Sequence, residues 1–255
     1  MNKVYLAFPR HNRLVDIGAA QSIFATPRSE RNRHRYEMIT GGKGTSLLPY
    51  TFNMLLNEAL NNGATHFAML HSDIAPEPAW LDKLYDKLEE MSADVVSVVV
   101  PIKTPQGLTS TAIGSIDDEW TVLKRLTMRE VVKLPETFTA ADAGFPGHPL
   151  LINTGCWLAD LRKPIWTATD DHGVADFAFD FRNRRVLCAD GTWDQDCQPE
   201  DWRLGRALFA AGARYYATRC VQVQHFGDTA FGNAHPWGSC EVDPAYEPKD
   251  LAGCA

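Results

Sequence analysis

The sequence lacks any apolar stretch of membrane-spanning length. Its longest strongly apolar run, residues 95–101, has the length of a strand, whereas a membrane-spanning helix needs about 20 residues. It also lacks a charged N-terminal region followed by an apolar one, so we expect no secretory signal and a cytoplasmic location. None of the six cysteines is spaced Cys-x-x-Cys, which argues against a zinc ribbon or a redox dithiol and favours reduced thiols.

A surplus of basic charge is also missing. The chain has 25 Lys and Arg residues against 32 Asp and Glu residues, a formal net charge of −7, which argues against a dedicated nucleic-acid-binding protein. The basic residues are nevertheless concentrated in one segment, from Arg10 to Arg35, where six arginines stand against two acidic residues. This segment is either a solvated surface or a rim that faces phosphates, in which case it would contact DNA.

The 255 residues have the composition of an ordinary globular protein, with 45% hydrophobic residues. Short apolar segments alternate along the chain with amphipathic segments. We predict an α/β fold with a mostly parallel sheet covered by helices on both faces, because the strands are apolar throughout rather than alternating. The predicted strands are 4–8, 36–40, 66–70, 94–100 and 214–223, and the predicted helices are 16–24, 49–61, 76–90 and 201–211.

We expect one domain with two halves. Residues 1–103 would form a nucleotide-binding half and residues 104–232 a second half that begins with loops and an edge hairpin. Residues 233–255 are rich in proline and glycine and would form a mobile tail. Ligands of such sheets bind at the carboxyl ends of the strands.

Asp73 is the most informative acidic residue. It follows an apolar strand and precedes a proline-rich helix start, and a carboxylate there is costly unless it meets a cation or hydrogen-bond donors. Residues 64–81 resemble the Asp-x-Asp region of GT-A glycosyltransferases, most closely the inverting family two: a strand, Asp-x-Asp, a hydrophobic residue, then Pro-x-x-Leu. Asp73 matches the last Asp of that motif, and His71 stands in place of the first.

The resemblance implies that Asp73 binds Mn²⁺ or Mg²⁺ on the diphosphate of a nucleotide-sugar donor, such as a UDP-sugar, with His71 and Ser72 beside it. The alternative is that Asp73 only caps the following helix. Asn53 matches the Asn of an Arg-Asn pair that the family carries on the preceding helix. Pro9 and Arg10, after the first strand, would border the nucleoside.

Three further segments extend the resemblance. Residues 152–158 look like a Thr-Gly segment on the acceptor side, or a glycine that lets strands approach closely. Asp201, with Glu200 in reserve, matches the family's general base, although simple helix capping would also explain the pair. The helix N-terminus is expected to favour their ionised forms. His225 begins a His-x-Gly segment and would complete the metal shell.

Together these matches predict a single GT-A-like, Rossmann-like domain with an acceptor-side half. The implied function is that of a metal-dependent inverting glycosyltransferase that moves a hexose to an acceptor hydroxyl, on a saccharide, a protein or a hydroxymethylated DNA base. Two alternatives stay open. The missing first Asp is compatible with a catalytically silent nucleotide-sugar-binding protein. Residues 41–49 look like the phosphate loop of sugar-nucleotide pyrophosphorylases, with Ser46 in place of its arginine.

Overall fold

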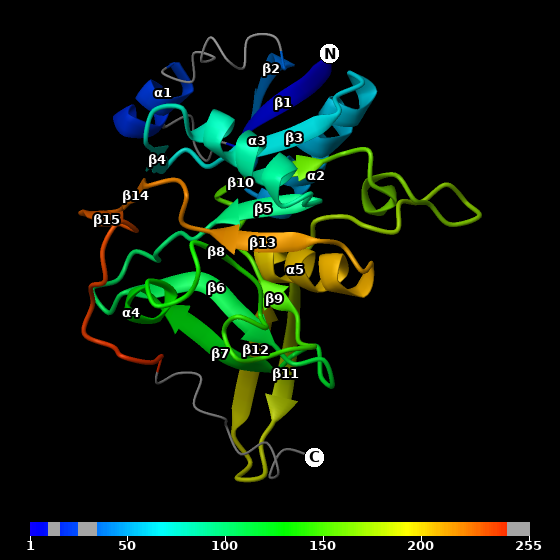
Figure 1. The fold of residues 1–255 in the computed structure, drawn as a ribbon. Coiled ribbons are helices and arrows are strands. Elements are labelled where there is room, and N and C mark those ends of the chain that lie inside the picture. The colour runs from blue at the N-terminus through cyan, green and yellow to red at the C-terminus, as the bar shows by residue number, and fades with distance from the viewer. Residues whose placement is uncertain (10–15, 25–34, 244–255) are drawn as a thin grey trace.

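A seven-stranded sheet forms the centre of the molecule (Figure 1). The computed structural model describes residues 1–9, 16–24 and 35–243. Five of the seven strands point the same way, and only β10 and β8 run against them. The strand order is β2 (Tyr36–Lys43), β1 (Asn2–Pro9), β3 (His66–Leu70), β10 (Cys156–Asp160), β5 (Val95–Val98), β13 (Tyr215–Thr218) and β8 (Thr137–Phe138).

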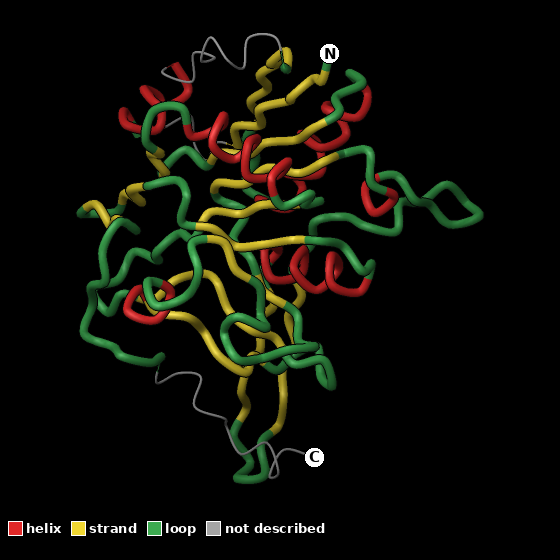
Figure 2. The backbone as a smooth tube through the Cα atoms, in the orientation of Figure 1, coloured by secondary structure: helices red, strands yellow, loops and turns green. Residues whose placement is uncertain are grey.

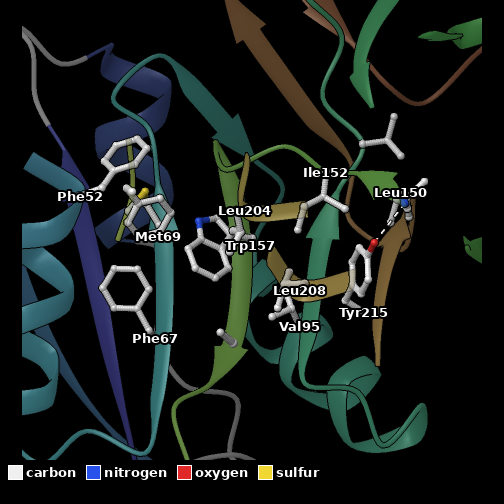
Figure 3. Close-up of a cluster of buried hydrophobic side chains, with 14 of the residues drawn as sticks. Phe52, Phe67, Met69, Val95, Leu150, Ile152, Trp157, Leu204, Leu208 and Tyr215 are labelled. Carbon is white, nitrogen blue, oxygen red and sulfur yellow. Dashed lines mark hydrogen bonds between the residues drawn. The ribbon is translucent and has the colours of Figure 1, made fainter. Parts of the chain in front are cut away.

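Helices cover both faces of this sheet (Figure 2). On one face, α2 (Leu48–Asn61) and α5 (Glu200–Ala210) pack against alternate strand residues such as Phe67 and Trp157 (Figure 3). On the other face, α3 (Trp80–Glu90) packs against their neighbours, such as Ala68 and Leu158. Each fully buried large side chain contributes about 1.5–3 kcal/mol. The predicted α/β class, with its strands buried on both faces, is confirmed.

The segment after Asp73 differs from the prediction. Residues 76–79 are not helical: β4 (Ile74–Pro76) pairs with β14 (Val223–Phe226), and α3 begins only after Ala79, which has a left-handed φ of 61°. β4 is an edge strand, where a proline is tolerated because its missing N–H would face away from the ladder. The predicted strand 214–223 is accordingly divided between β13 and β14. The third strand of this small sheet is β15 (Ala230–Gly232), and α1 (Ile17–Phe24) lies against β4.

The second half contains more regular structure than the predicted loops and edge hairpin. A three-stranded antiparallel sheet is formed by β7 (Val122–Thr127), β6 (Leu108–Gly114) and β9 (Leu150–Leu151). The hairpin of β11 (Arg182–Leu187) and β12 (Trp193–Gln198) projects beyond it (Figure 1). The short elements α4 (Met128–Val131) and η1 (Pro164–Trp166) complete the described structure.

Residues 233–243, which we expected to belong to a mobile tail, contact the rest of the chain at several points. The Asn233 amide donates to Val99 O and Val221 O and accepts from Val223 N. Further along, a Cβ on Gly107 would lie 2.2 Å from the carbonyl oxygen of Trp237, so the two backbones are in direct contact. The segment is therefore a strap across the second half, while residues 244–255 lie outside the described part of the chain.

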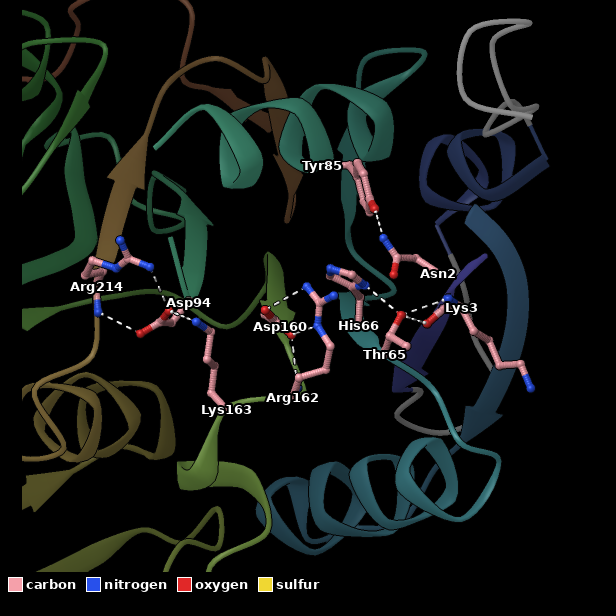
Figure 4. Close-up of polar contacts among 10 residues, drawn as sticks. All are labelled: Asn2, Lys3, Thr65, His66, Tyr85, Asp94, Asp160, Arg162, Lys163 and Arg214. Carbon is pink, nitrogen blue, oxygen red and sulfur yellow. Dashed lines mark hydrogen bonds and ion pairs between the residues drawn. The ribbon is translucent and has the colours of Figure 1, made fainter. Parts of the chain in front are cut away.

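The amino ends of the parallel strands carry a polar network (Figure 4). Asp94, just before β5, pairs with Lys163 at 2.9 Å, and Asp160 pairs with Arg162 at 2.7 Å. His66, the first residue of β3, is buried there, and burial lowers its pKa to about 4. These contacts hold the strand ends together, and they lie at the edge of the sheet opposite to the residues considered next. Within the described part of the chain, no helix has the length and apolar character needed to cross a membrane.

Candidate functional site

Three segments converge on Asp73 at the carboxyl edge of the sheet. Asp73 follows β3, Lys103 follows β5, and His225 lies in β14, far along the chain. The Lys103 ammonium lies 2.5 Å from Asp73 Oδ2, and His225 Nε2 lies 3.4 Å from the same oxygen. Burial alone would raise the pKa of Asp73, but the hydrogen bonds from His225 and Lys103 outweigh it and hold that pKa well below its usual range. The Asp73 carboxylate is therefore charged at neutral pH.

The second ring nitrogen of His225 fixes how the imidazole faces Asp73. His225 Nδ1 lies 2.8 Å from the carbonyl oxygen of Pro101. A carbonyl oxygen can only accept, so Nδ1 carries a proton and Nε2 is the atom turned toward the carboxylate. Metal-binding histidines are commonly oriented in this way, by donating their other N–H to a carbonyl or carboxylate.

The pair formed by Asp73 and His225 suits a divalent cation in its donor chemistry. A carboxylate oxygen and an imidazole nitrogen are ligands that Mn²⁺ accepts, and Mg²⁺ is usually held by one or two carboxylates together with substrate phosphates. No group of three or more His, Cys, Asp or Glu side chains positioned for a metal occurs in the described residues.

His71, which replaces the first Asp of the motif, is used differently. Its ring packs against Phe52 with 5.3 Å between centroids, and its Nε2 is buried with no hydrogen-bond partner among the described residues. Burial lowers the His71 pKa to about 4, so the ring is neutral at pH 7. Backbone contacts fix the rest of the segment: Asp16 N donates to Ser72 O, and Phe226 N donates to Asp73 O, each at 2.8 Å.

Asn53 and Pro9 occupy supporting positions. The Asn53 amide donates to Phe179 O at 2.7 Å and accepts from Phe179 N at 2.8 Å, so both of its polar atoms clamp a buried backbone. Pro9 is buried at the carboxyl end of β1, opposite Lys43. Arg10 lies outside the described residues.

Glu200 and Asp201 begin α5 and are more buried than their expected role at a helix N-terminus suggests. Pro199 is the N-cap and no side chain caps the helix, so capping does not account for the pair. Asp201 is 9% exposed, and its Oδ1 accepts from Trp202 N at 2.7 Å. Burial raises the pKa of both carboxyls, and the charge of Glu200 raises that of Asp201 further. Desolvation thus outweighs the helix N-terminus, contrary to our expectation that the ionised forms are favoured.

A chain of hydrogen bonds connects the start of α5 with the Asp73 segment. Trp202 Nε1 donates to Ser110 O at 2.7 Å, and Asn153 Nδ2 donates to Ser110 Oγ at 2.6 Å. Gly155 N donates to Asn153 Oδ1 at 2.6 Å, and Gly155 O accepts from the backbone N of His71 at 2.8 Å. The structure therefore links the two groups of carboxylates through residues 153–155, the segment that the sequence pointed to.

Two glycines explain the close packing around this chain of contacts. A Cβ on Gly155 would lie 2.3 Å from Ile74 Cδ1, so a side chain at this position would displace the end of the Ile74 side chain on β4. A Cβ on Gly205 would lie 2.6 Å from the carbonyl oxygen of Leu150, so glycine lets α5 contact β9 directly. These contacts are compatible with the close-approach interpretation of residues 152–158, and a role toward an acceptor stays a prediction.

The segment 41–49, which resembles a pyrophosphorylase phosphate loop, begins in a strand and not in a loop. Gly41, Gly42 and Lys43 belong to β2. A Cβ on Gly41 would lie 1.7 Å from Tyr5 Oη, so this glycine is needed for packing. A phosphate loop presents backbone N–H groups from an irregular segment, and the first part of the motif is paired strand instead.

Of the arginines in the basic segment, Arg35 is the one that lies in the described part of the chain. Arg35 forms ion pairs with Asp86 and Glu89 of α3, and its guanidinium lies 4.9 Å from the centroid of the Tyr85 ring. The guanidinium is thus used within the fold. The arginines from Arg10 to Arg33 lie outside the described residues.

A cavity of about 660 Å³ lies next to the site, on the other side of the small sheet that contains β4 and β14. It lies between α1, β4 and β14, and its lining includes Gln224 and Phe226. Side chains alternate along a strand, so His225, between these two, points to the opposite face. The cavity is therefore separated from Asp73 by the small sheet.

Lys103 and Pro101 are the site residues that the sequence interpretation missed. They follow the apolar run 94–100, and residues after a parallel strand lie at the edge where ligands bind. Their position after this strand could have indicated both residues from the sequence, although no recognisable motif includes them.

Comparison with known proteins does not assign the chain to a family. No model of a known protein family matches it, and no curated protein does. Among solved structures, it is similar to A197 from STIV, with 14% sequence identity and a TM-score of 0.49 over 95% of this chain and 97% of that one. A resemblance this distant leaves the function to be argued from the site itself.

Proposed function

We propose that this protein transfers a sugar from a nucleotide-sugar donor, such as a UDP-sugar, to an acceptor hydroxyl. The observation that carries the proposal is the convergence of Asp73, His225 and Lys103 at the carboxyl edge, connected through residues 153–155 to the carboxylates of α5. The sheet, with parallel strands and helices on both faces, is compatible with a GT-A-like domain, in which such an edge binds the donor.

In this proposal the two groups of residues have separate tasks. Asp73 and His225 hold Mn²⁺ or Mg²⁺, which when bound would neutralise the charge that develops on the departing diphosphate. Asp201 accepts the proton of the acceptor hydroxyl, whose oxygen attacks the anomeric carbon from the face opposite to the diphosphate, so that configuration inverts. A raised pKa suits this task, because a stronger base accepts a proton more readily, provided that it is ionised at the working pH.

A catalytically silent nucleotide-sugar-binding protein is the second candidate. It is favoured by the neutral ring of His71, which does not supply the charge of the Asp that it replaces. A pyrophosphorylase is disfavoured, because the first part of the matching segment is a strand in β2. The acceptor stays open between a saccharide, a protein and a hydroxymethylated DNA base.

The test is a donor-hydrolysis screen of UDP-, GDP-, ADP- and TDP-sugars, with and without Mn²⁺, on the full chain. Release of the nucleoside diphosphate that is lost in Asp201→Asn supports the transferase. Binding without turnover selects the silent binding protein, and formation of nucleoside triphosphate from pyrophosphate selects the pyrophosphorylase. The absence of both binding and turnover across the donors would contradict the proposal.

A further inference from the structure

We propose that Lys103 is a phosphate-binding residue that occupies the cation position on Asp73 until a divalent cation binds. When the cation takes Asp73 Oδ2, the ammonium turns to a phosphate oxygen of the donor. This inference rests on the proposed function, because it assigns a residue to the diphosphate of the same donor.

Lys103 and a divalent cation would compete for one oxygen of Asp73. Lys103 Nζ lies 2.5 Å from Asp73 Oδ2, the oxygen that His225 Nε2 also faces at 3.4 Å. A divalent cation bound to that oxygen and to Nε2 would repel an ammonium group in contact with the same atom. Metal binding therefore requires Lys103 Nζ to move.

The Lys103 side chain is directed by its surroundings, while its ammonium end is accessible. A Cβ on Gly227 would lie 3.1 Å from Lys103 Cδ and 3.5 Å from its Cβ and Cγ, so the glycine of the His-x-Gly segment makes room for the lysine stem. The Lys103 side chain is 36% exposed. A flexible stem with an accessible ammonium can exchange a carboxylate for a nearby anion.

Phosphate suits the displaced ammonium group in its chemistry. The ammonium group is a compact charge with three donors and is a common partner of phosphate. Lys103 lies at the edge where the diphosphate of the proposed donor would meet the cation on Asp73. A displaced ammonium would therefore find phosphate oxygens as its new partner, and the diphosphate would be neutralised from two sides.

The experiment uses the full chain and two separate titrations by calorimetry. The first titrates Mn²⁺ without nucleotide into wild type and Lys103→Met. We expect Lys103→Met to bind Mn²⁺ roughly tenfold more tightly, the scale of one lost charge-assisted contact. The second titrates pyrophosphate in the presence of saturating Mn²⁺, where we expect Lys103→Met to bind roughly tenfold more weakly, and Lys103→Arg to retain most of the affinity.

Lys124→Met is the matched control. Lys124 is 33% exposed and pairs with Glu130 at 2.7 Å on β7 and α4, away from Asp73, so its loss changes net charge equally but should alter neither affinity. Thermal melts check that each variant is folded.

Lys103→Met should change the affinities for Mn²⁺ and for pyrophosphate in opposite directions. Unchanged or weaker Mn²⁺ binding by Lys103→Met overturns the inference, as does unchanged pyrophosphate binding. Pyrophosphate carries neither sugar nor nucleoside, so both expected shifts in a protein that hydrolyses no donor would support the role of Lys103 while the transferase proposal fails.

Discussion

His225 donates its Nδ1 proton to the carbonyl oxygen of Pro101 across 2.8 Å, and this bond joins β14 to the segment that follows β5. The same bond turns Nε2 toward Asp73. Since the two residues are 124 positions apart, the orientation of the candidate metal ligand depends on correct folding of both halves of the chain.

We expect Asp73→Asn to weaken Mn²⁺-dependent binding of UDP at least tenfold while leaving the fold intact. The amide keeps the shape of the side chain but loses the charge that a divalent cation prefers. Calorimetry with and without Mn²⁺ measures the effect, and Asp171→Asn, at an exposed aspartate, is the control. Wild-type affinity in Mn²⁺ would remove Asp73 from the metal site.

Asp201→Asn should lower turnover by roughly 10²–10⁴-fold with little change in donor affinity, the usual contribution of a general base. The amide keeps the acceptor for Trp202 N but cannot take a proton. Steady-state rates with the donor found in the screen give the measurement. A large loss in Glu200→Gln, together with a normal rate in Asp201→Asn, would reverse the assignment within the pair.

The same Asp201→Asn variant should be more stable than wild type at neutral pH. Burial raises the folded-state pKa of Asp201, so the unfolded chain ionises first as the pH rises. Wild-type stability is therefore lost from the ordinary carboxyl pKa of about 4 upward, through the raised folded-state pKa. Thermal melts at about pH 4 and pH 7 should show the gain of the variant at pH 7 only. A gain of equal size at both values would contradict the burial of a charge.

Asn53→Ala tests whether Asn53 supports the fold or binds the donor directly. Removing the amide leaves the buried backbone N–H and carbonyl of Phe179 without partners, which costs about 1–3 kcal/mol for each unsatisfied group. Urea unfolding should show this loss. Asn62→Ala on the same helix, where the amide bonds Glu58 O in an exposed position, should change stability by less than about 0.5 kcal/mol. Normal stability with lost UDP binding would instead support a direct role for Asn53.

The basic segment can be tested by separating Arg35 from Arg31 and Arg33. Arg35→Ala should reduce stability and leave any binding to DNA unchanged, because its guanidinium is paired with Asp86 and Glu89. If DNA is the acceptor, Arg31→Ala with Arg33→Ala should flatten the salt dependence by about one unit of slope for each lost contact. Failure to bind hydroxymethylated and plain duplexes at ~50 mM salt would exclude DNA.

The sequence by itself determined the α/β class and most of the central strands. Apolar runs such as Val95–Val98 are buried whichever element lies on either side, so a local pattern suffices to identify them. It also pointed to two candidate site residues: Asp73, because it follows an apolar strand, and His225, because its segment resembles a His-x-Gly motif. Periodicity failed where a contact between distant segments determines the local structure. Residues 74–76 form a strand only because β14 pairs with them.

Only the tertiary structure decided which side chains meet at Asp73 and how they are charged. Lys103 reaches the carboxylate because β3 and β5 end at the same edge of the sheet, with β10 between them. The raised pKa of Asp201 and the neutral ring of His71 come from burial, which depends on every element packed around them. Residues 233–243 are held in place by the hydrogen bond from Asn233 to Val99 O and by contact between the Gly107 and Gly238 backbones. Neither interaction has a local signature, because each joins residues more than a hundred positions apart in the chain.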